Sequence, residues 1–309
     1  MGAISNLFGY LLNLLYELVN NYGIAIILFS VLLRIILLPI TIKQQKSMEK
    51  TNKIQGELKS LQFKYKNNPE MLNKETMELY KREKISPFSG CLSAILQIII
   101  ILSVFWLVSQ PLTYMKKVKN NDELNNIVES YKTQIQEENS TRRNYIEIEV
   151  ISRIEKDYET IKEQLLQEDI ENKEELEVEK NNYEKLRINM EFLGLDLSKV
   201  PRNNLKDYKV YIIPLLYVIS SFVSIRISTN MQNKKKETEK ENNKQKDDSV
   251  DASEAMAQMN KNMSYIMPLM TLSIAFIAPL GLALYWFVSN VLMIVERLVI
   301  KKVMSAKEV

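Results

Sequence analysis

Five long apolar runs, separated by highly charged segments, constrain this sequence more than any other feature. The longer runs reach the ~20 residues that an α-helix needs to cross ~30 Å of hydrocarbon. They are apolar on every face, so a soluble core could not easily bury several of them. We therefore predict an all-α integral membrane protein with five transmembrane helices. The runs occupy about residues 22–42, 87–110, 208–228, 265–278 and 281–300.

The composition excludes several kinds of chemistry. The 309 residues include no histidine, which rules out imidazole general-base catalysis and histidine metal ligands. The single cysteine, Cys91, lies among apolar residues and can form no disulfide within the chain. We accordingly expect no catalytic residue, no metal site, no cofactor and no enzymatic activity.

The distribution of basic residues predicts the orientation of the spans. Residues 43–86 carry eleven Lys or Arg against six Asp or Glu, and further basic residues flank the other spans on the same side. Basic residues concentrate in cytoplasmic loops, so we place this side in the cytoplasm. Residues 112–207 carry sixteen basic and twenty-two acidic residues and would be extracellular. The amino end then lies outside and the carboxyl end in the cytoplasm.

These boundaries predict nine segments along the chain. In order, we expect an interfacial amphipathic helix (1–20), a first transmembrane helix (21–42), a cytoplasmic helical hairpin (43–86), a second transmembrane helix (87–111), an extracellular charged helical and coiled-coil insert (112–207), a third transmembrane helix (208–228), a cytoplasmic flexible loop (229–262), the fourth and fifth transmembrane helices (263–300) and a short basic cytoplasmic tail (301–309).

Local patterns support the segments outside the spans. Leucines at helical spacing in residues 4–19 predict the amphipathic helix. A cleaved signal peptide is the alternative, but the segment lacks a basic start and an A-x-A-like site. Turn-forming Asn67, Asn68 and Pro69 divide the charged segment 43–84 into two helices. Spacing of three and four residues predicts a coiled-coil seam within the insert. The seam comprises Ile151, Ile154, Tyr158, Ile161 and Leu165.

Arg34 is the strongest functional signal because it lies inside the first apolar run. At 1.5 Å per residue it is about 18 Å from the start of that helix, in the predicted cytoplasmic half of the membrane. A mid-helix arginine costs ~2.5–3.5 kcal/mol on insertion scales, which usually marks a function or a partner. The other spans contain one acidic residue, Glu296, near the cytoplasmic end. We therefore expect Arg34 to have no fixed counter-ion at its own depth. Snorkelling to the interface or a structural ion pair is the alternative.

Polar side chains on several spans could line a water-filled groove together with Arg34. Taken singly, each is more often a helix-packing contact. Tyr285 and Trp286 could instead form an interfacial aromatic belt. The candidate substrate-binding groove comprises Arg34, Ser30, Thr41, Gln97, Ser220, Ser224, Tyr285, Trp286 and Asn290.

Several ordered motifs resemble the YidC/Oxa/Alb family of membrane protein insertases. Residues 34–48, RIILLPITIKQQKSM, resemble the first conserved helix of that family and its exit. Residues 87–97, beginning PFSGCL, look like the second helix. Residues 192–197, FLGLDL, resemble the element before the third helix, and residues 279–290, PLGLALYWFVSN, resemble the closing hairpin. The resemblance covers the chain except for much of the insert.

The resemblance implies a five-helix membrane core around a hydrophilic groove that opens to the cytoplasm and to lipid. It implies an insertase and chaperone that moves client segments into the bilayer without nucleotide hydrolysis, with Arg34 attracting their acidic outer tails. The implied partners are newly made membrane proteins and the lipid bilayer, with the ribosome and the Sec translocon as further candidates and no specific nucleic acid. The implied location is a bacterial plasma membrane, and the lack of a large periplasmic domain points to the Gram-positive type.

The sequence departs from the family pattern at three places. Ser93 stands where a proline is usual, and Ile225 where a groove glutamine is common, which leaves Ser224 as the nearest polar substitute. The insert is also larger than expected. Two other functions fit the residues alone. The protein could be a small anion-binding transporter or channel, or a scaffold whose main element is the insert. The polar groups lie mainly in the predicted inner half of the membrane, which favours a blind groove over a channel.

Overall fold

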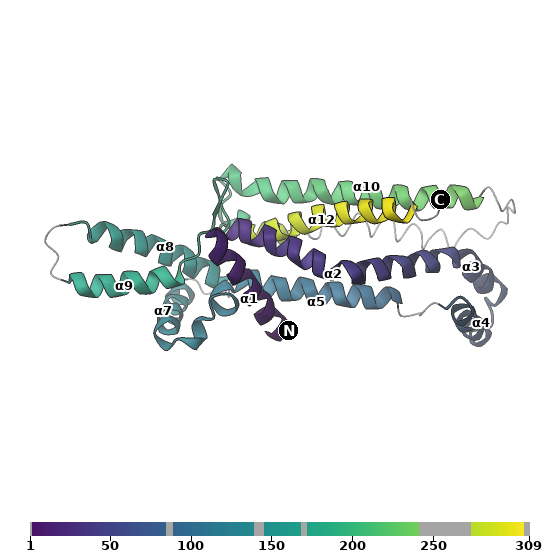
Figure 1. The fold of residues 1–309 in the computed structure, drawn as a ribbon, viewed down its shortest axis with the longest axis horizontal. Coiled ribbons are helices and arrows are strands. Elements are labelled where there is room, and N and C mark those ends of the chain that lie inside the picture. The colour runs from purple at the N-terminus through teal and green to yellow at the C-terminus, as the bar shows by residue number, and fades with distance from the viewer. Residues whose placement is uncertain (1, 85–88, 139–144, 168–171, 241–272, 306–309) are drawn as a thin grey trace. The chain divides into compact units, whose positions relative to one another are not determined.

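The computed structural model describes residues 2–84, 89–138, 145–167, 172–240 and 273–305. The described chain is predominantly helical (Figure 1). It divides into two compact units. Unit 1 contains Met1–Val31, Leu102–Ser228 and Met267–Val295, and unit 2 contains Leu32–Ile101, Thr229–Ile266 and Glu296–Val309. The elements are α1 (Gly2–Val19), α2 (Tyr22–Lys53), α3 (Gln55–Lys64), α4 (Pro69–Arg82), α5 (Ser89–Ser109), α6 (Pro111–Tyr114), η1 (Val118–Asn120), α7 (Asp122–Glu138), α8 (Ile146–Gln164), α9 (Lys173–Leu186), β1 (Glu191–Phe192), β2 (Leu195–Asp196), η2 (Pro201–Asn203), η3 (Tyr208–Tyr211), α10 (Ile212–Lys240) and α12 (Leu280–Ser305).

Three helices in the described part of the chain are long and apolar enough to cross a membrane. They cover Tyr22–Ser47, Tyr208–Ile227 and Leu280–Ile300, and Ile95–Ser109 is a shorter apolar helix. The predicted fourth span and the start of the second lie partly outside the described residues, although residues 273–277 are helical. This pattern is the one expected of an all-α, multi-pass membrane protein.

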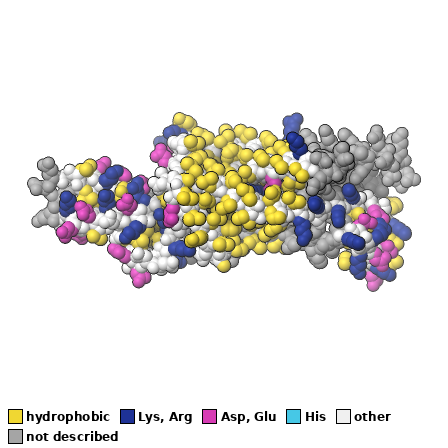
Figure 2. All heavy atoms as spheres, in the orientation of Figure 1, with side chains coloured by type: hydrophobic (Ala, Val, Ile, Leu, Met, Phe, Trp, Pro, Cys, Tyr) yellow, Lys and Arg dark blue, Asp and Glu magenta, His cyan; other side chains and the backbone are white. Residues whose placement is uncertain are grey.

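The apolar helices expose large hydrophobic side chains. On α10 these side chains form a broad outer face, which Figure 2 shows as an almost uncharged surface. In the same unit, charged side chains gather over α7, α8 and α9 (Figure 2). An extended exposed apolar face requires lipid or a partner to cover it. The α10 residues concerned are Leu215, Leu216, Ile219, Phe222 and Val223.

Two helices continue beyond their predicted ends. The first span was expected to end at residue 42, but α2 continues through Pro39 to Lys53. The third span was expected to end at residue 228 and a flexible loop to follow, but α10 continues to Lys240. Both extensions are rich in Lys, Glu and Gln, which favour helix. A fall in hydropathy therefore marks the end of the apolar segment, not the end of the helix. The rest of the predicted loop, residues 241–262, lies outside the described residues.

The central part of the insert is a bundle of three helices, since α8 packs against both α7 and α9. Four of the five predicted seam residues, Ile151, Ile154, Tyr158 and Ile161, are buried on α8, whereas Leu165 follows the helix and is only partly buried. The helices are also joined by polar contacts. The Tyr131 hydroxyl of α7 donates to Asp157 of α8 at 2.5 Å and lies 2.9 Å from the Tyr183 hydroxyl of α9. Local spacing was sufficient to identify the buried face, but the third helix in the packing was not predicted.

Helix α1 presents two different faces. Its buried face consists of Ser5, Gly9, Leu12 and Tyr16, and it packs on α6. The packing is close, because a Cβ atom added at Gly9 would lie 2.0 Å from the carbonyl oxygen of Tyr114. The opposite face exposes leucines, with 66% of Leu7, 46% of Leu14 and 75% of Leu18 accessible. These leucines belong to the face expected to contact lipid, and the small residues allow the other face to approach the protein.

The chain returns from the insert at an anchor formed by Asn189. The Asn189 backbone N–H donates to the Tyr16 hydroxyl at 2.8 Å, and its carbonyl accepts from Tyr22 N–H at 2.9 Å. Its side-chain amide donates to the Asn20 carbonyl at 3.1 Å. The three bonds tie the end of the insert to the junction of α1 and α2.

A short antiparallel hairpin follows this anchor. Glu191 pairs with Asp196, and Phe192 pairs with Leu195. The intervening Leu193 and Gly194 both have positive φ, as a two-residue turn of type I′ requires. The Phe192 ring packs against Gly23, where an added Cβ would lie 2.4 Å from its Cγ.

In unit 2, α3 and α4 pack against each other (Figure 1). The Asn68 side chain caps α4 by accepting from Met71 N–H at 3.1 Å, and Pro69 is the first helical residue. In the structure, α3 ends at Lys64 and α4 begins at Pro69, on either side of the predicted turn. The buried contact between them is small: Ile54 and Leu79, with Leu58, Leu61 and Tyr80 around them.

Candidate polar groove

Arg34 lies on α2 with a side chain that is 21% exposed. Its Nη1 contacts Glu296 Oε2 of α12 at 3.4 Å, and the Glu296 side chain is only 9% exposed. Both residues belong to unit 2. The expectation that Arg34 has no fixed counter-ion is therefore wrong. Counting from the ends of the apolar runs placed the two residues at different depths. The register between two helices is set by their packing, which such counting does not include.

A third charge lies near this pair. Arg297 is within electrostatic range of both Arg34 and Glu296. The three groups together carry two positive charges and one negative charge. These three groups by themselves sum to a charge of about +1, and Arg34 and Arg297 each have further interactions.

The two other candidates in unit 2 differ in exposure. Thr41 is half-buried on α2, and its hydroxyl donates to the Leu37 carbonyl at 3.2 Å. That bond satisfies the donor within the helix itself. Gln97 is exposed on α5. An exposed amide on an otherwise apolar helix needs a polar environment or a partner.

The candidates of unit 1 include a buried polar cluster. The Asn290 side-chain amide on α12 donates to the hydroxyls of Ser220 at 3.0 Å and Ser221 at 3.1 Å, both on α10. The Ser220 hydroxyl in turn donates to the Tyr217 carbonyl at 2.8 Å. Asn290, Ser220 and Ser221 are all buried. The structure thus brings together two of the predicted residues and adds Ser221.

The remaining candidates of unit 1 are also mainly enclosed. Ser30 is buried, and its hydroxyl donates to the Ile26 carbonyl at 2.7 Å. Ser224 is buried on α10, one helical turn beyond Ser220. Tyr285 is only 5% exposed, which does not fit a side chain of an exposed aromatic belt. Trp286 is partly exposed, and its ring lies 6.2 Å from that of Tyr217.

Sequence reasoning missed three residues of these sites. Ser221 adjoins Ser220 in the sequence, so a polar pair on one span was a visible signal. Glu296 is visible in the sequence as the one acidic residue of the other spans, and Arg297 follows it directly, but neither was assigned to Arg34. Two adjacent opposite charges at the end of an apolar run are themselves a signal for an intramembrane charge cluster. In the described part of the chain, no group of three or more Cys, Asp or Glu side chains is arranged to hold a metal ion.

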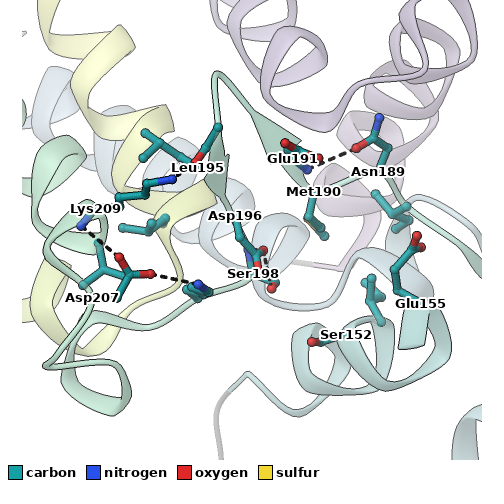
Figure 3. A pocket seen from close by; sticks show the side chains of 16 residues that line it. Ser152, Glu155, Asn189, Met190, Glu191, Leu195, Asp196, Ser198, Asp207 and Lys209 are labelled. Carbon is teal, nitrogen blue, oxygen red and sulfur yellow. Dashed lines mark hydrogen bonds and ion pairs between the residues drawn. The ribbon is translucent and has the colours of Figure 1, made fainter. Parts of the chain in front are cut away.

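A cavity of about 440 Å³ lies elsewhere in unit 1, where the insert meets the hairpin and the start of α12 (Figure 3). Its wall carries both signs of charge. Asp207 accepts from Lys199 Nζ at 2.8 Å and from the Lys209 backbone N–H at 3.1 Å, and these bonds lower the pKa of its carboxyl. Asp196 accepts from the backbone N–H and the hydroxyl of Ser198, at 2.9 and 2.6 Å. These groups satisfy one another, and the cavity contains none of the predicted groove residues.

The family follows from the sequence comparisons. The profile of the 60Kd inner membrane protein family matches residues 14–307. The chain belongs to this family. Among its relatives is the membrane protein insertase YidC of Fusobacterium nucleatum subsp. nucleatum, 46% identical over 96 residues, which are 31% of this chain and 47% of that protein. The insertase YidC of Caldanaerobacter subterraneus subsp. tengcongensis is 45% identical over 105 residues, 34% of this chain and 51% of that protein.

A longer relative shows the same similarity over a smaller share of its length. The insertase YidC of Francisella tularensis subsp. novicida is 40% identical over 106 residues, which are 34% of this chain and 19% of that protein. The chain thus spans about half the length, or less, of these relatives. The resemblance of the motifs to the YidC/Oxa/Alb family is confirmed. Together with the apolar helices, it makes the chain a multi-pass bacterial membrane protein.

Proposed function

We propose that the protein is a membrane protein insertase and chaperone that moves client segments from water into the bilayer without hydrolysing a nucleotide. One observation carries the proposal: a partly exposed arginine, Arg34, inside an apolar helix long enough to span a membrane. The curated relatives are named insertases, which supports the same function.

The proposed mechanism begins with attraction. The acidic outer tail of a client leaves bulk water and approaches Arg34, whose site has a net positive charge. At an effective dielectric near 20, a pair at ~4 Å gains about 4 kcal/mol. Desolvation of both charges offsets most of that gain, so the tail is bound weakly enough to be released. A net gain of ~1.4 kcal/mol would correspond to a tenfold preference for an acidic tail.

The proposed architecture is a core of five transmembrane helices around a groove open to the cytoplasm and to lipid. We expect its lining to include the polar side chains predicted from the sequence, which are Thr41 and Gln97 in unit 2 and Ser30, Ser220, Ser224, Tyr285, Trp286 and Asn290 in unit 1. The exposed apolar face of α10 supports a second role, because a client span could slide along it while the tail crosses.

We also propose the topology that the charge pattern predicts. The amino end and the insert lie outside, and the α3–α4 segment and the carboxyl end lie in the cytoplasm. Clients are newly made membrane proteins, and the cytoplasmic α3–α4 segment is suited to meet them or their ribosome first. The exposed leucines of α1 rest in the outer interface.

The test is insertion of single-span clients into liposomes that contain the purified protein. One client has two aspartates in its outer tail and the other has asparagines there. Arg34→Lys should retain most insertion of the acidic client, because charge matters more than guanidinium geometry. Arg34→Ala should reduce it about tenfold, and Arg34→Glu should be worse. The asparagine client should depend little on residue 34.

A matched control is Arg202→Ala, which removes an exposed arginine outside the predicted spans. It should insert both clients at the rate of the unchanged protein. Equal insertion of the acidic client by Arg34→Ala would show that Arg34 is structural. An ion leak without insertion would instead indicate a channel.

A further inference from the structure

We infer that Glu296 is a resident counter-ion of Arg34, which a client carboxylate replaces while Arg297 retains Glu296. The inference rests on the proposed function and concerns how the arginine is kept ready between clients. It makes Glu296 a positioning and specificity residue, because it sets how strongly Arg34 attracts an acidic tail.

The geometry of the pair is that of a weak contact. Arg34 Nη1 meets one oxygen of Glu296 at 3.4 Å. Another Arg–Glu pair of the same unit is much closer, since Arg82 Nη2 lies 2.6 Å from both oxygens of Glu57. Strong arginine–carboxylate pairs have two short bonds of about 2.7–2.9 Å. A client carboxylate that reaches Arg34 could form such a pair, so it can compete with Glu296.

Glu296 is buried but incompletely hydrogen-bonded, so its weak contact with Arg34 is unusual for a structural ion pair. Its side chain is 91% buried, and its Oε1 has no hydrogen-bond partner in the part of the chain that the structure describes. Buried carboxylate oxygens are normally satisfied, because an unmade hydrogen bond is unfavourable there. The resting site is therefore not a finished structural ion pair. It holds Glu296 beside Arg34 through a single long contact.

Arg297 provides a nearby positive charge for Glu296 after a client carboxylate has bound to Arg34. A buried carboxylate left without a cation would oppose release of Arg34. Arg297 lies within electrostatic range of Glu296 and of Arg34, in the same unit. When a client carboxylate takes Arg34, Glu296 remains beside Arg297, and the site changes from a net charge of about +1 to about zero. When the tail leaves, Glu296 shares Arg34 again.

The experiment measures the affinity of the full-length protein in nanodiscs for the two clients described above, each labelled for fluorescence anisotropy. Glu296→Gln should bind the aspartate client three- to tenfold more tightly, because the internal competitor is gone. The asparagine client should bind unchanged. Glu138→Gln is the matched control, since it removes an exposed glutamate that pairs with Arg153 in the insert, outside the proposed client-binding parts, and should leave both affinities unchanged.

Two further variants keep the inference testable if Glu296→Gln folds poorly. Glu296→Asp retains the charge and should restore the affinity of the unchanged protein to within about twofold. Arg297→Gln leaves Glu296 to compete fully for Arg34, and it should weaken binding of the aspartate client. An unchanged or lower affinity in Glu296→Gln overturns the inference, and so does an unchanged affinity in Arg297→Gln.

Failure of this inference can be told apart from failure of the proposed function. If Arg34→Ala loses insertion while Glu296→Gln binds the aspartate client normally, Arg34 attracts the acidic tail but Glu296 does not compete with the tail for Arg34. If Arg34→Ala inserts that client normally, the proposed role of Arg34 is itself wrong.

Discussion

Two enclosed glutamates of this protein differ in how completely their oxygens are bonded. Glu147 of the insert is 2% exposed and accepts from the Thr113 backbone N–H at 2.9 Å, the Thr113 hydroxyl at 2.5 Å and Lys132 Nζ at 3.2 Å. Glu296 has the single 3.4 Å contact with Arg34 and an oxygen without a partner among the described residues. A saturated carboxylate fixes a structure, whereas an unsaturated one can exchange partners.

This difference predicts that Glu147 is structural. Glu147→Gln should destabilise the insert by about 3 kcal/mol, because an amide cannot satisfy all three donors and leaves Lys132 poorly paired. The measurement is hydrogen exchange of the slowest amides of α8. The control is Glu129→Gln, which removes the other partner of Lys132 but at a side chain that is 54% exposed. We expect it to change stability by less than about 0.5 kcal/mol. Similar effects of the two variants would contradict this reading of Glu147.

At the residue scale, the sequence was informative about charge and not about pairing. Arg34 was identifiable because an arginine inside an apolar run is unfavourable wherever it points. The pair with Glu296 and the cluster around Asn290 depend on which faces of distant helices meet. Spacing along one helix carries no information about that contact, so these partners could not be derived.

At the scale of elements, the packing of α1 depends on a residue without a side chain. An alanine at position 9 would place its Cβ 2.0 Å from the Tyr114 carbonyl oxygen. Gly9→Ala should therefore detach or shift α1, and the amides of α1 should exchange with solvent faster. Gly2→Ala is the control on the same helix, because nothing lies within 4 Å of a Cβ there. Unchanged exchange in Gly9→Ala would show that α6 yields without disturbing α1.

The α3–α4 segment should open easily and lie in the cytoplasm. Its buried contact consists of Ile54, Leu79 and three partly buried neighbours, and such a small apolar contact stabilises little. Protease added to inside-out vesicles should cut this segment before the spans. Right-side-out vesicles are the control and should be protected. The reverse pattern would invert the proposed topology. Truncation of the segment should impair insertion more than it impairs folding of the spans.

Element boundaries were predictable where local chemistry sets them. Asn68 and Pro69 begin α4 because a capping side chain and a proline act within one turn. The ends of α2 and α10 were misplaced because hydropathy was used as a proxy for helix. Pro39 does not end α2, since a proline removes one helical hydrogen bond and a long helix can tolerate that with a bend.

At the scale of the whole molecule, the insert and the membrane helices are joined through a few defined contacts. The sequence places the insert outside the family motifs, which predicts that it is dispensable for the core reaction. The structure restricts where it can be removed, because Asn189 bonds to Tyr16, Asn20 and Tyr22. A deletion of residues 121–189 would remove this anchor together with the insert.

We therefore expect two deletions to behave differently. Replacing residues 122–186 by a Gly-Ser linker should leave insertion of a simple client largely intact. Extending the deletion to residue 189 should lower insertion severalfold, because the junction of α1 and α2 loses three hydrogen bonds. Liposome insertion measures both, with thermal unfolding in parallel. If a well-folded shorter deletion loses all activity, the insert takes part in the reaction directly.

In the proposed topology, the depth of Arg34 has a consequence for the role of the membrane potential. Arg34 lies twelve residues beyond the start of α2, which is about 18 Å of helix. When the cytoplasmic side is negative, the membrane potential does about 2.3 kcal/mol of work per 100 mV on one carboxylate that crosses the full thickness of the membrane. With a uniform field over ~30 Å, roughly 1.4 kcal/mol of that work acts after the tail has passed Arg34. Water in the groove would shift still more of the voltage drop to the outer side. The potential then contributes less to capture than to the later step, in which it drives the tail off the arginine toward the positive side.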